Sequence, residues 1–312
     1  MKPDLLILAP LPDFLRHPLE ASFTCHDFFH ADDRELLLRE NGTAIRAIVQ
    51  SGGTVAPIEL LERLPALEII TVFGVGYDGV PVEYCKGRGI YITNTPDVLT
   101  DDVADIAVAL VHMTSRSLPT AERYLLSGSW EKGAYPLTWS LKQKVAGIVG
   151  LGRIGKAIAT RLAASGMSIA YTGRRRQTEV DYAFHSTLGE LADVADFLII
   201  ACPGGEATRH LVNATILNRL GPEGTLINIS RGSVVDETAL IHALEKGAIR
   251  AAGLDVFETE PLVPPALSAL SNVVLLPHVG SATWETRNAM ADLCVKNLRA
   301  HFSGQPLLTP AY

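Results

Sequence analysis

The chain has 312 residues, of which 47% are hydrophobic and 20% charged, and its formal net charge is −7. This length suits two domains of ordinary size, and the composition is typical of a globular protein and excludes a disordered one. The negative charge argues against a nucleic acid or an anionic membrane surface as the partner.

Short apolar runs alternate with longer amphipathic segments, a pattern typical of β-α units around a parallel sheet. In the first third of the chain, the pattern predicts strands over 5–9, 44–50, 68–73 and 90–93, a helix over 57–64 and a long helix over 101–114. The sequence Asn94-Thr95-Pro96 breaks the pattern just before this long helix. We therefore place a domain boundary near residue 97.

A second β-α series begins near residue 145. It predicts strands over 145–149, 168–172, 196–201, 225–229, 251–254 and 273–276, and helices over 154–164, 214–220 and 237–246. The last helix, over 284–302, is long enough to leave this series and pack on the first. We therefore expect one domain formed by 1–97 and 288–312, with a second domain, 98–287, inserted into it.

The cysteines and apolar runs predict a cytoplasmic protein. No stretch approaches the ~20 apolar residues that a membrane helix requires, and prolines interrupt the first apolar run before it reaches the length of a signal sequence. Four widely spaced cysteines form no disulfide or metal-ligand pattern: Cys25, Cys85, Cys202 and Cys294. We expect reduced thiols, no metal and no membrane partner.

A glycine-rich loop in VAGIVGLGRIGKAIA predicts a dinucleotide site. Gly150, Gly152 and Gly155 directly follow a predicted strand and open a predicted helix. In this context the first glycine permits a tight turn, the second lets the backbone approach a pyrophosphate, and the third lets the helix pack closely on the strand. The amides of Arg153 and Ile154, at the positive end of the helix, would hold the phosphate oxygens.

The segment SIAYTGRRRQ, 168–177, predicts the form of the dinucleotide. It ends the second strand of the unit, where an acidic residue normally binds the ribose 2′-hydroxyl of NAD. Arg174 and Arg175 stand there instead, and guanidinium groups suit a 2′-phosphate. The segment therefore favours NADPH/NADP+, with Arg176 facing solvent. The alternative is that all three arginines are a solvated surface run.

Chemically reactive side chains follow three predicted strands of the same series. Arg231 lies in INISRGSVVDE, Asp255 and Glu260 in AGLDVFETEPL, and His278 in LLPHVGSAT. Ligands of open α/β sheets bind at the carboxyl ends of strands. His278 can exchange a proton near neutral pH, Glu260 would favour its charged form, and Arg231 can hold an anion. Glu258 is the alternative to Glu260.

Several of these motifs together resemble the D-isomer-specific 2-hydroxyacid dehydrogenases. The resemblance covers nearly the whole chain, through VFGVGYDGV, VLTDDVADIAVAL, GIVGLGRIGKAIA, NISRGSVVDE, GLDVFETEP and PHVGSATWETR. YTGRRR and SATWETR are most similar to the glyoxylate/hydroxypyruvate reductase branch. The resemblance implies an α/β fold of two Rossmann-like domains, in which a doubly wound parallel-sheet dinucleotide domain is inserted into a flavodoxin-like substrate domain.

The same resemblance implies roles for individual residues. Arg231, Glu260 and His278 would be catalytic, and Arg231 and His278 would also contact the substrate. Asp255 would bind the nicotinamide carboxamide. The other implied contacts are Val75, Gly76, Ser51 and Gly52 with the substrate, and Cys202 and Pro203 with the cofactor. Trp139 lies in the segment that reaches across a dimer in this family, where it would either cover the neighbouring active site or pack at the interface.

The resemblance thus implies an NADPH-dependent enzyme, a homodimer that reduces small 2-oxo acids. Glyoxylate would give glycolate, and hydroxypyruvate would give D-glycerate. One alternative is a D-2-hydroxyacid dehydrogenase that prefers a different 2-oxo acid. The other is a non-catalytic, dinucleotide-sensing protein similar to the C-terminal-binding-protein corepressors, although the chain shows no partner-binding tail after its last predicted helix.

Overall fold

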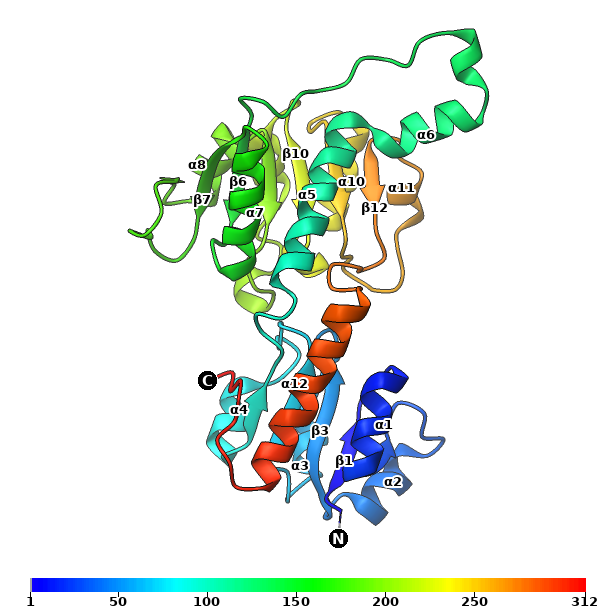
Figure 1. Cartoon of the computed structure of the whole chain (residues 1–312), viewed down its shortest axis with the longest axis vertical. Coiled ribbons are helices and arrows are strands. Elements are labelled where there is room, and N and C mark those ends of the chain that lie inside the picture. Colours follow the sequence, from blue (N-terminus) through cyan, green and yellow to red (C-terminus); the bar gives the residue numbers. More distant parts are fainter. Residues whose placement is uncertain (1) are drawn as a thin grey trace. The chain divides into compact units, whose positions relative to one another are not determined.

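The computed structural model describes residues 2–312 and divides the chain into two compact units (Figure 1). The first unit comprises the residues up to Leu99 together with Thr283–Tyr312, and the second comprises Thr100–Ala282. Both units are built around a parallel β-sheet. Within residues 2–312, none of the helices combines the length and the apolar character that crossing a membrane would require.

The first unit has the flavodoxin-like strand order β2-β1-β3-β4-β5, and all neighbouring strands are parallel. Its strands are β1 (Asp4–Ile7), β2 (Thr24–Asp27), β3 (Ile45–Ser51), β4 (Ile69–Phe73) and β5 (Tyr91–Thr93). Its helices are α1 (Asp13–Ser22), α2 (Arg34–Asn41), α3 (Ile58–Glu62), α4 (Val82–Arg88) and α12 (Trp284–Phe302). The predicted flavodoxin-like topology is confirmed.

Helix α12 joins the end of the chain to the sheet of the first unit. The thiol of Cys294, fully buried, donates to the carbonyl of Val72 in β4. The side chain of Asn297, also fully buried, accepts from the amides of Leu308 and Thr309 and so holds the last residues against the helix. Because helices cover both faces, the central strands are buried along their length and appear in the sequence as continuous apolar runs.

The second unit has the order β12-β11-β10-β9-β6-β7-β8, again with parallel neighbours. Its strands are β6 (Val145–Val149), β7 (Ser168–Thr172), β8 (Ala183–Phe184), β9 (Phe197–Ile200), β10 (Thr225–Asn228), β11 (Ala251–Leu254) and β12 (Val273–Leu275). The order reverses direction beside β6, which is the doubly wound pattern of a Rossmann domain. This confirms the predicted fold class, and the strand order reverses between β6 and β9, the position at whose carboxyl ends open α/β sheets bind their ligands.

The helices of the second unit cover both faces of its sheet. They are α5 (Thr100–Arg116), α6 (Leu118–Leu126), α7 (Arg153–Ala164), α8 (Leu188–Val194), α9 (Ala214–Leu220), α10 (Glu237–Glu245) and α11 (Pro265–Ser268), with single turns η1 (Ser129–Lys132), η2 (Glu206–Thr208) and η3 (Gly232–Val234). Arg161 of α7 bonds to Asp101 and Asp105 of α5 at 2.8 and 2.6 Å and ties the two helices together.

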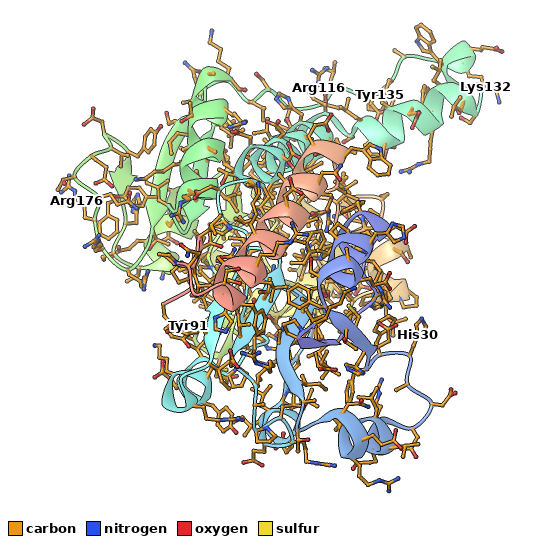
Figure 2. The ribbon with its side chains drawn as sticks, turned by 60° about the horizontal axis from the view of Figure 1, so that its bottom comes forward. His30, Tyr91, Arg116, Lys132, Tyr135 and Arg176 are labelled. Carbon is orange, nitrogen blue, oxygen red and sulfur yellow. The ribbon has the colours of Figure 1, made fainter. Side chains whose placement is uncertain are left out.

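Helix α6 and turn η1 form an arm that extends away from the sheet of the second unit (Figure 1). No residue of α6 is buried, and apolar side chains on and after it are exposed, Leu126 to 78% and Leu137 fully. The labelled Lys132 lies at the outer end of the arm, and Arg116 lies nearer the body of the unit (Figure 2). The arm therefore presents apolar surface that nothing within the second unit covers.

Candidate active site

The glycine-rich loop connects β6 to α7 and lies against the end of two other strands. The amide of Gly150 donates to the carbonyl of Thr172 at the end of β7, at 3.0 Å. Its φ is 95°, and a Cβ placed on it would lie 2.8 Å from the backbone of Cys202, which follows β9. Both the left-handed backbone and the close approach require glycine here. The loop is therefore held between the carboxyl ends of β7 and β9.

The start of α7 offers backbone amides to an anion. Gly152 precedes the helix and has no side chain to cap it, and a Cβ placed on Gly152 would meet nothing within 4 Å. By contrast, a Cβ on Gly155 would lie 2.2 Å from the carbonyl oxygen of Gly150, so the helix packs tightly on the loop. An open approach to the first turn of a twelve-residue helix fits a dinucleotide pyrophosphate.

A hollow of about 490 Å³ lies between this loop and the segment after β7. Arg174, Arg175 and Arg176 are exposed and make no ion pair with residues 2–312. The residues that line the hollow are Leu151, Gly152, Arg153, Lys156, Arg175, Arg176, Gln177, Thr178 and Glu179. Arg176 lies on the outer part of the loop after β7 (Figure 2).

This lining differs from the sequence-based expectation at two residues, because Arg174 was expected to face the ligand and Arg176 to face solvent. Arg175 and Arg176 line the hollow, whereas Arg174 does not. The reason lies in Gln177, whose amide donates to the Tyr171 hydroxyl and whose side chain donates to the carbonyl of Leu151, both at 2.7 Å. These two bonds hold Gln177 against the glycine-rich loop, so the segment approaches the loop only after Arg174 in the sequence. Counting residues from the glycine motif cannot reveal such a turn.

Cys202 and Pro203 follow β9 beside the glycine-rich loop. The hydroxyl of Ser230 donates to the carbonyl of Cys202 and so links the ends of β9 and β10. Burial raises the pKa of the Cys202 thiol to about 11, so the thiol is neutral at physiological pH. Cys202 therefore contributes its backbone and an apolar side chain to this loop, and no thiolate.

His278 and Glu260 form a hydrogen-bonded pair after β12 and β11. The Nδ1 atom of His278 lies 2.7 Å from the Oε2 atom of Glu260, and the Oε1 atom of Glu260 accepts from the amide of Phe257 at 3.0 Å. His278 has a φ of 53°, an uncommon backbone conformation for a side chain of its size. Strained residues of this kind gather at functional sites, where surrounding bonds hold them.

The charge of Glu260 is stabilised by its neighbours. Burial alone would raise the pKa of this carboxyl group, but the His278 hydrogen bond and charge, the Phe257 amide and the Arg231 charge together lower it below its ordinary value. Glu260 is therefore ionised at neutral pH and requires a proton on Nδ1 of His278. The remaining ring nitrogen, Nε2, has no hydrogen-bond partner within residues 2–312. The pair has the geometry of a general acid-base dyad.

Glu258, the alternative partner in the sequence, is bound elsewhere. Its Oε1 atom lies 3.0 Å from Arg209 and 2.8 Å from the Nε2 atom of His210. Its backbone amide donates to the carboxyl group of Glu237 at 2.7 Å. Glu258 thus holds its loop in place, and Glu260 is the glutamate that contacts His278.

Arg231 lies shortly after the end of β10, beside the loop that carries Glu260. Its guanidinium bonds to the carbonyl of Ser230 at 2.9 Å, and its own carbonyl accepts from Asn228 at 2.9 Å. A Cβ on the next residue, Gly232, would lie 1.8 Å from the carbonyl carbon of Phe257, so the two backbones are in direct contact. This contact places the positive charge of Arg231 close enough to lower the pKa of Glu260.

Asp255 has a structural role that the sequence did not reveal. It is 1% exposed, and its two carboxyl oxygens accept from the amides of Val279 and Gly280 at 2.7 and 2.8 Å. Burial raises its pKa, although these two amides act in the opposite direction. These bonds fix the loop after His278, and the contact with the nicotinamide carboxamide that the resemblance implied stays a prediction. A lone aspartate at the end of a buried strand is the signal that could have indicated this role.

The expected substrate residues of the first unit lie on two neighbouring loops. Ser51 ends β3 and bonds through its hydroxyl to Thr54, and Gly52 follows it. A Cβ on Gly74, which follows β4, would lie 3.3 Å from the Cα atom of Gly52. The carbonyl of Val75 accepts from Asn94 at 2.7 Å, which fixes the loop that contains Gly76. The structure therefore brings the four residues Ser51, Gly52, Val75 and Gly76 to one edge of this sheet.

Comparison with known proteins agrees with these features. Residues 108–280 match the family model described as the D-isomer specific 2-hydroxyacid dehydrogenase, NAD binding domain. The match covers more than half of the chain and includes the glycine-rich loop, Arg231, Glu260 and His278. The chain belongs to the D-isomer-specific 2-hydroxyacid dehydrogenases.

Several relatives extend the similarity over the whole chain. The chain is 47% identical to glyoxylate/hydroxypyruvate reductase A HPR2 of Arabidopsis thaliana, over 98% of both proteins. It is 43% identical to 2-ketogluconate reductase of Gluconobacter oxydans, over 99% of this chain and 98% of the relative. A crystal structure of an NADPH-dependent glyoxylate/hydroxypyruvate reductase from Sinorhizobium meliloti, in complex with NADP and malonate, shares 46% identity. Its TM-score is 0.94, over 100% of this chain and 97% of that one.

Proposed function

We propose that the protein reduces small 2-oxo acids to 2-hydroxy acids with NADPH, converting glyoxylate to glycolate and hydroxypyruvate to D-glycerate. The observation that carries this proposal is the hydrogen-bonded pair of Glu260 and His278 beside Arg231, in a chain of this family. The names of the relatives from Arabidopsis and Sinorhizobium support the substrate class, and the NADP complex of the latter supports the cofactor.

The residues of the second unit fit NADPH. The tight packing at Gly150 and the open space at Gly152 suit a pyrophosphate on the first amides of α7, those of Arg153 and Ile154. The cationic lining after β7 suits a 2′-phosphate, with Arg175 and Arg176 facing the hollow and Arg174 next to them in the sequence. When bound, NADPH supplies the hydride for reduction of the substrate carbonyl.

The chain's own residues supply the proton and hold the substrate. His278 donates its Nε2 proton to the carbonyl oxygen while the carbonyl carbon gains the hydride, because Nδ1 is engaged by Glu260. Glu260 stabilises the charged imidazole before the transfer and orients the ring throughout. Arg231 polarises the carbonyl and pairs with the substrate carboxylate. In the first unit, the residues proposed to bind substrate are Val75 and Gly76, through their amides, together with Ser51 and Gly52.

This proposal assigns a role to each expected domain. Residues 1–97 and 288–312 bind the substrate, and residues 98–287 bind the dinucleotide through the glycine-rich loop, Cys202, Pro203 and Asp255. The protein acts in the cytoplasm.

We also propose that it is a homodimer, because Leu126 and Leu137 on and after the arm expose large apolar side chains. The guanidinium carbon of Arg250, in the same chain, lies 5.0 Å from the centre of the Trp139 ring, and the backbone carbonyl of Trp139 accepts from the Ser115 hydroxyl. These contacts favour packing of Trp139 at the interface over insertion into a neighbouring site.

Steady-state kinetics test the proposal. The substrates are glyoxylate, hydroxypyruvate, hydroxyphenylpyruvate and 2-ketogluconate, each with NADPH and NADH, because relatives at 44% and 43% identity carry the names of reductases of the last two. We expect the highest kcat/KM for glyoxylate or hydroxypyruvate with NADPH. Preference for a bulkier acid would identify a different dehydrogenase of the family. Binding of NADPH without any turnover would support the dinucleotide-sensing alternative and contradict catalysis.

A further inference from the structure

The hollow beside the glycine-rich loop contains one carboxylate among its cations. Four positively charged residues line it, Arg153, Lys156, Arg175 and Arg176, and Glu179 lines it as well. It lies between the loop expected to hold the pyrophosphate and the end of β7, where the adenine ribose of a Rossmann domain is bound. A site for a 2′-phosphate has no need of an anion, so the presence of Glu179 calls for a physical account.

Glu179 forms an ion pair with Lys156 across this hollow. Lys156 lies on the first turns of α7, Glu179 lies on the segment after β7, and their Nζ and Oε1 atoms are 3.0 Å apart. The side chains are 41% and 60% exposed. The hydrogen bond from Lys156 lowers the pKa of Glu179, so its carboxylate is charged throughout the neutral range. Arg175 and Arg176 have no such partner within residues 2–312.

The ion pair is not what holds this segment in place. Gln177, two residues earlier, already bonds to Tyr171 through its backbone and to Leu151 through its side chain. An exposed ion pair contributes only about 0–1 kcal/mol to stability, since water and salt screen it. Lys156 can therefore exchange one anionic partner for another at little cost.

A phosphate monoester is the stronger partner for Lys156. It carries about −1.5 to −2 charges near neutral pH and offers three acceptor oxygens, whereas a carboxylate carries one charge. Once a phosphate enters the hollow, Lys156 can turn to it. Glu179 then loses its partner and remains as a like charge nearby, which opposes the phosphate.

We infer that Lys156 is a further cation for the 2′-phosphate of NADPH and that Glu179 competes with this phosphate for Lys156. The inference rests on the proposed NADPH-dependent function and adds two residues that set how tightly the 2′-phosphate is held. Arg175 and Arg176 select the phosphate, while the Lys156–Glu179 pair limits the affinity.

Calorimetric binding of nucleotide fragments tests this inference without catalysis. Adenosine 2′,5′-bisphosphate contains the 2′-phosphate, and adenosine 5′-monophosphate lacks it. We expect Glu179→Gln to tighten binding of the bisphosphate by about 2–5-fold and Lys156→Gln to weaken it by a similar factor, the size of a partly screened charge contact. Lys156→Arg should restore binding, and the monophosphate should bind all variants alike.

A matched pair in the first unit serves as the control. Lys86 and Glu83 are 2.8 Å apart, and the Lys86 side chain is also 41% exposed. Glu83→Gln and Lys86→Gln change the net charge in the same way as the test variants and should leave both affinities unchanged. Thermal unfolding of all variants checks that they are equally folded.

Three other outcomes are possible, and each would contradict a different part of the inference or of the proposed function. Unchanged bisphosphate affinity in Glu179→Gln and Lys156→Gln would show that the pair is ordinary surface charge. Weaker binding in Glu179→Gln would show that Glu179 positions Lys156 and does not compete with the ligand. If the unmodified protein bound both fragments equally, the NADPH preference in the proposed function would fail, a result distinct from failure of the pair.

Discussion

Glu258 and Glu260 lie on one loop of the second unit and each pairs with a histidine, and we propose proton transfer for only one of these pairs. Glu258 pairs with His210 at 2.8 Å, and Glu260, two positions later, pairs with His278 at 2.7 Å. Both histidines have a left-handed backbone, with φ of 49° and 53°. Residue type, distance and backbone strain are thus nearly the same in the two pairs.

The pairs differ in which ring nitrogen the glutamate engages. His210 uses Nε2, the nitrogen at the tip of the ring, so its reactive end is occupied by Glu258. His278 uses Nδ1, the nitrogen nearer the backbone, and its Nε2 remains available. A carboxylate on Nδ1 fixes the tautomer and directs the proton on Nε2 outward. The orientation of the ring, more than its partner, therefore separates the His210 pair from the pair that we propose for proton transfer.

The surroundings of the two glutamates sharpen this difference. Glu258 also contacts Arg209 and donates its amide to Glu237, whose pKa burial raises. Glu260 accepts from the Phe257 amide and lies near Arg231, which leaves His278 as its only side-chain hydrogen-bond partner within the described residues. The first pair ties several segments together, and the second faces outward at a strand end.

Replacing each histidine gives the largest expected difference between the pairs. His278→Ala removes the proton donor and should lower kcat by about 10²–10⁴-fold, while NADPH binding is kept. His210→Ala removes only a brace and should change kcat by less than about 5-fold, within what loss of one hydrogen bond produces. Steady-state kinetics and calorimetric NADPH binding measure both. Equal losses of kcat in the two variants would mean that the His210 pair takes part in catalysis.

Replacing each glutamate should give a smaller difference in the same direction. Glu260→Gln keeps a side-chain oxygen for the Phe257 amide but cannot stabilise a charged imidazole, so kcat should fall by on the order of 10²-fold. Glu258→Gln keeps the loop bonds in part, and we expect a loss of less than about 5-fold. The check is the pH profile of kcat, whose shape should change only in the Glu260 variant. A changed profile in Glu258→Gln alone would reverse the two roles.

The sequence could predict where these side chains gather because of how parallel strands are buried. The central strands are covered on both faces and appear in the sequence as continuous apolar runs, so the end of each run marks the carboxyl end of a strand. Arg231, Asp255 and His278 were located in this way, and each does follow a strand. The glycine-rich loop was equally clear, because its spacing is required by the contacts of Gly150 and Gly155.

The sequence could not decide questions that depend on short-range geometry. Glu258 and Glu260 have the same chemistry and lie two positions apart, so only the folded loop shows which one contacts His278. The edge strand β2 is only half-buried and lacks a continuous apolar run, and the helix α6 has no buried residue, so burial in the core marks neither of them. Pattern reasoning finds what the core requires and misses what lies at the edges.

Replacing Asp255 tests what holds the loop after His278. Asp255→Asn replaces one carboxyl oxygen with an amino group that faces a backbone amide, so one buried donor, of Val279 or Gly280, loses its partner. We expect a loss of about 1–3 kcal/mol in the free energy of unfolding, together with a lower kcat. Denaturant unfolding and kinetics measure these effects. Full stability and activity in this variant would show that the loop holds its shape without the carboxylate.

Acid unfolding should reveal the smallest difference, through the charge of Glu260. The pKa of this carboxyl group is lowered in the folded chain, so between the lowered value and the ordinary one of about 4.3 the folded state binds fewer protons than the unfolded state. The stabilisation is complete above the ordinary pKa and is lost as the pH falls through the lowered pKa of the folded state.

Glu260→Gln has no such carboxyl group and should lose less stability between about pH 6 and pH 3. Because a third of the Glu260 side chain is exposed, screening keeps this difference within about 1 kcal/mol. Denaturant unfolding at a series of pH values, with Glu83→Gln as the surface control, measures it. If the curves of Glu260→Gln and the unmodified protein ran parallel through this range, the Glu260–His278 pair would contribute nothing to folding, and its value would lie in catalysis alone.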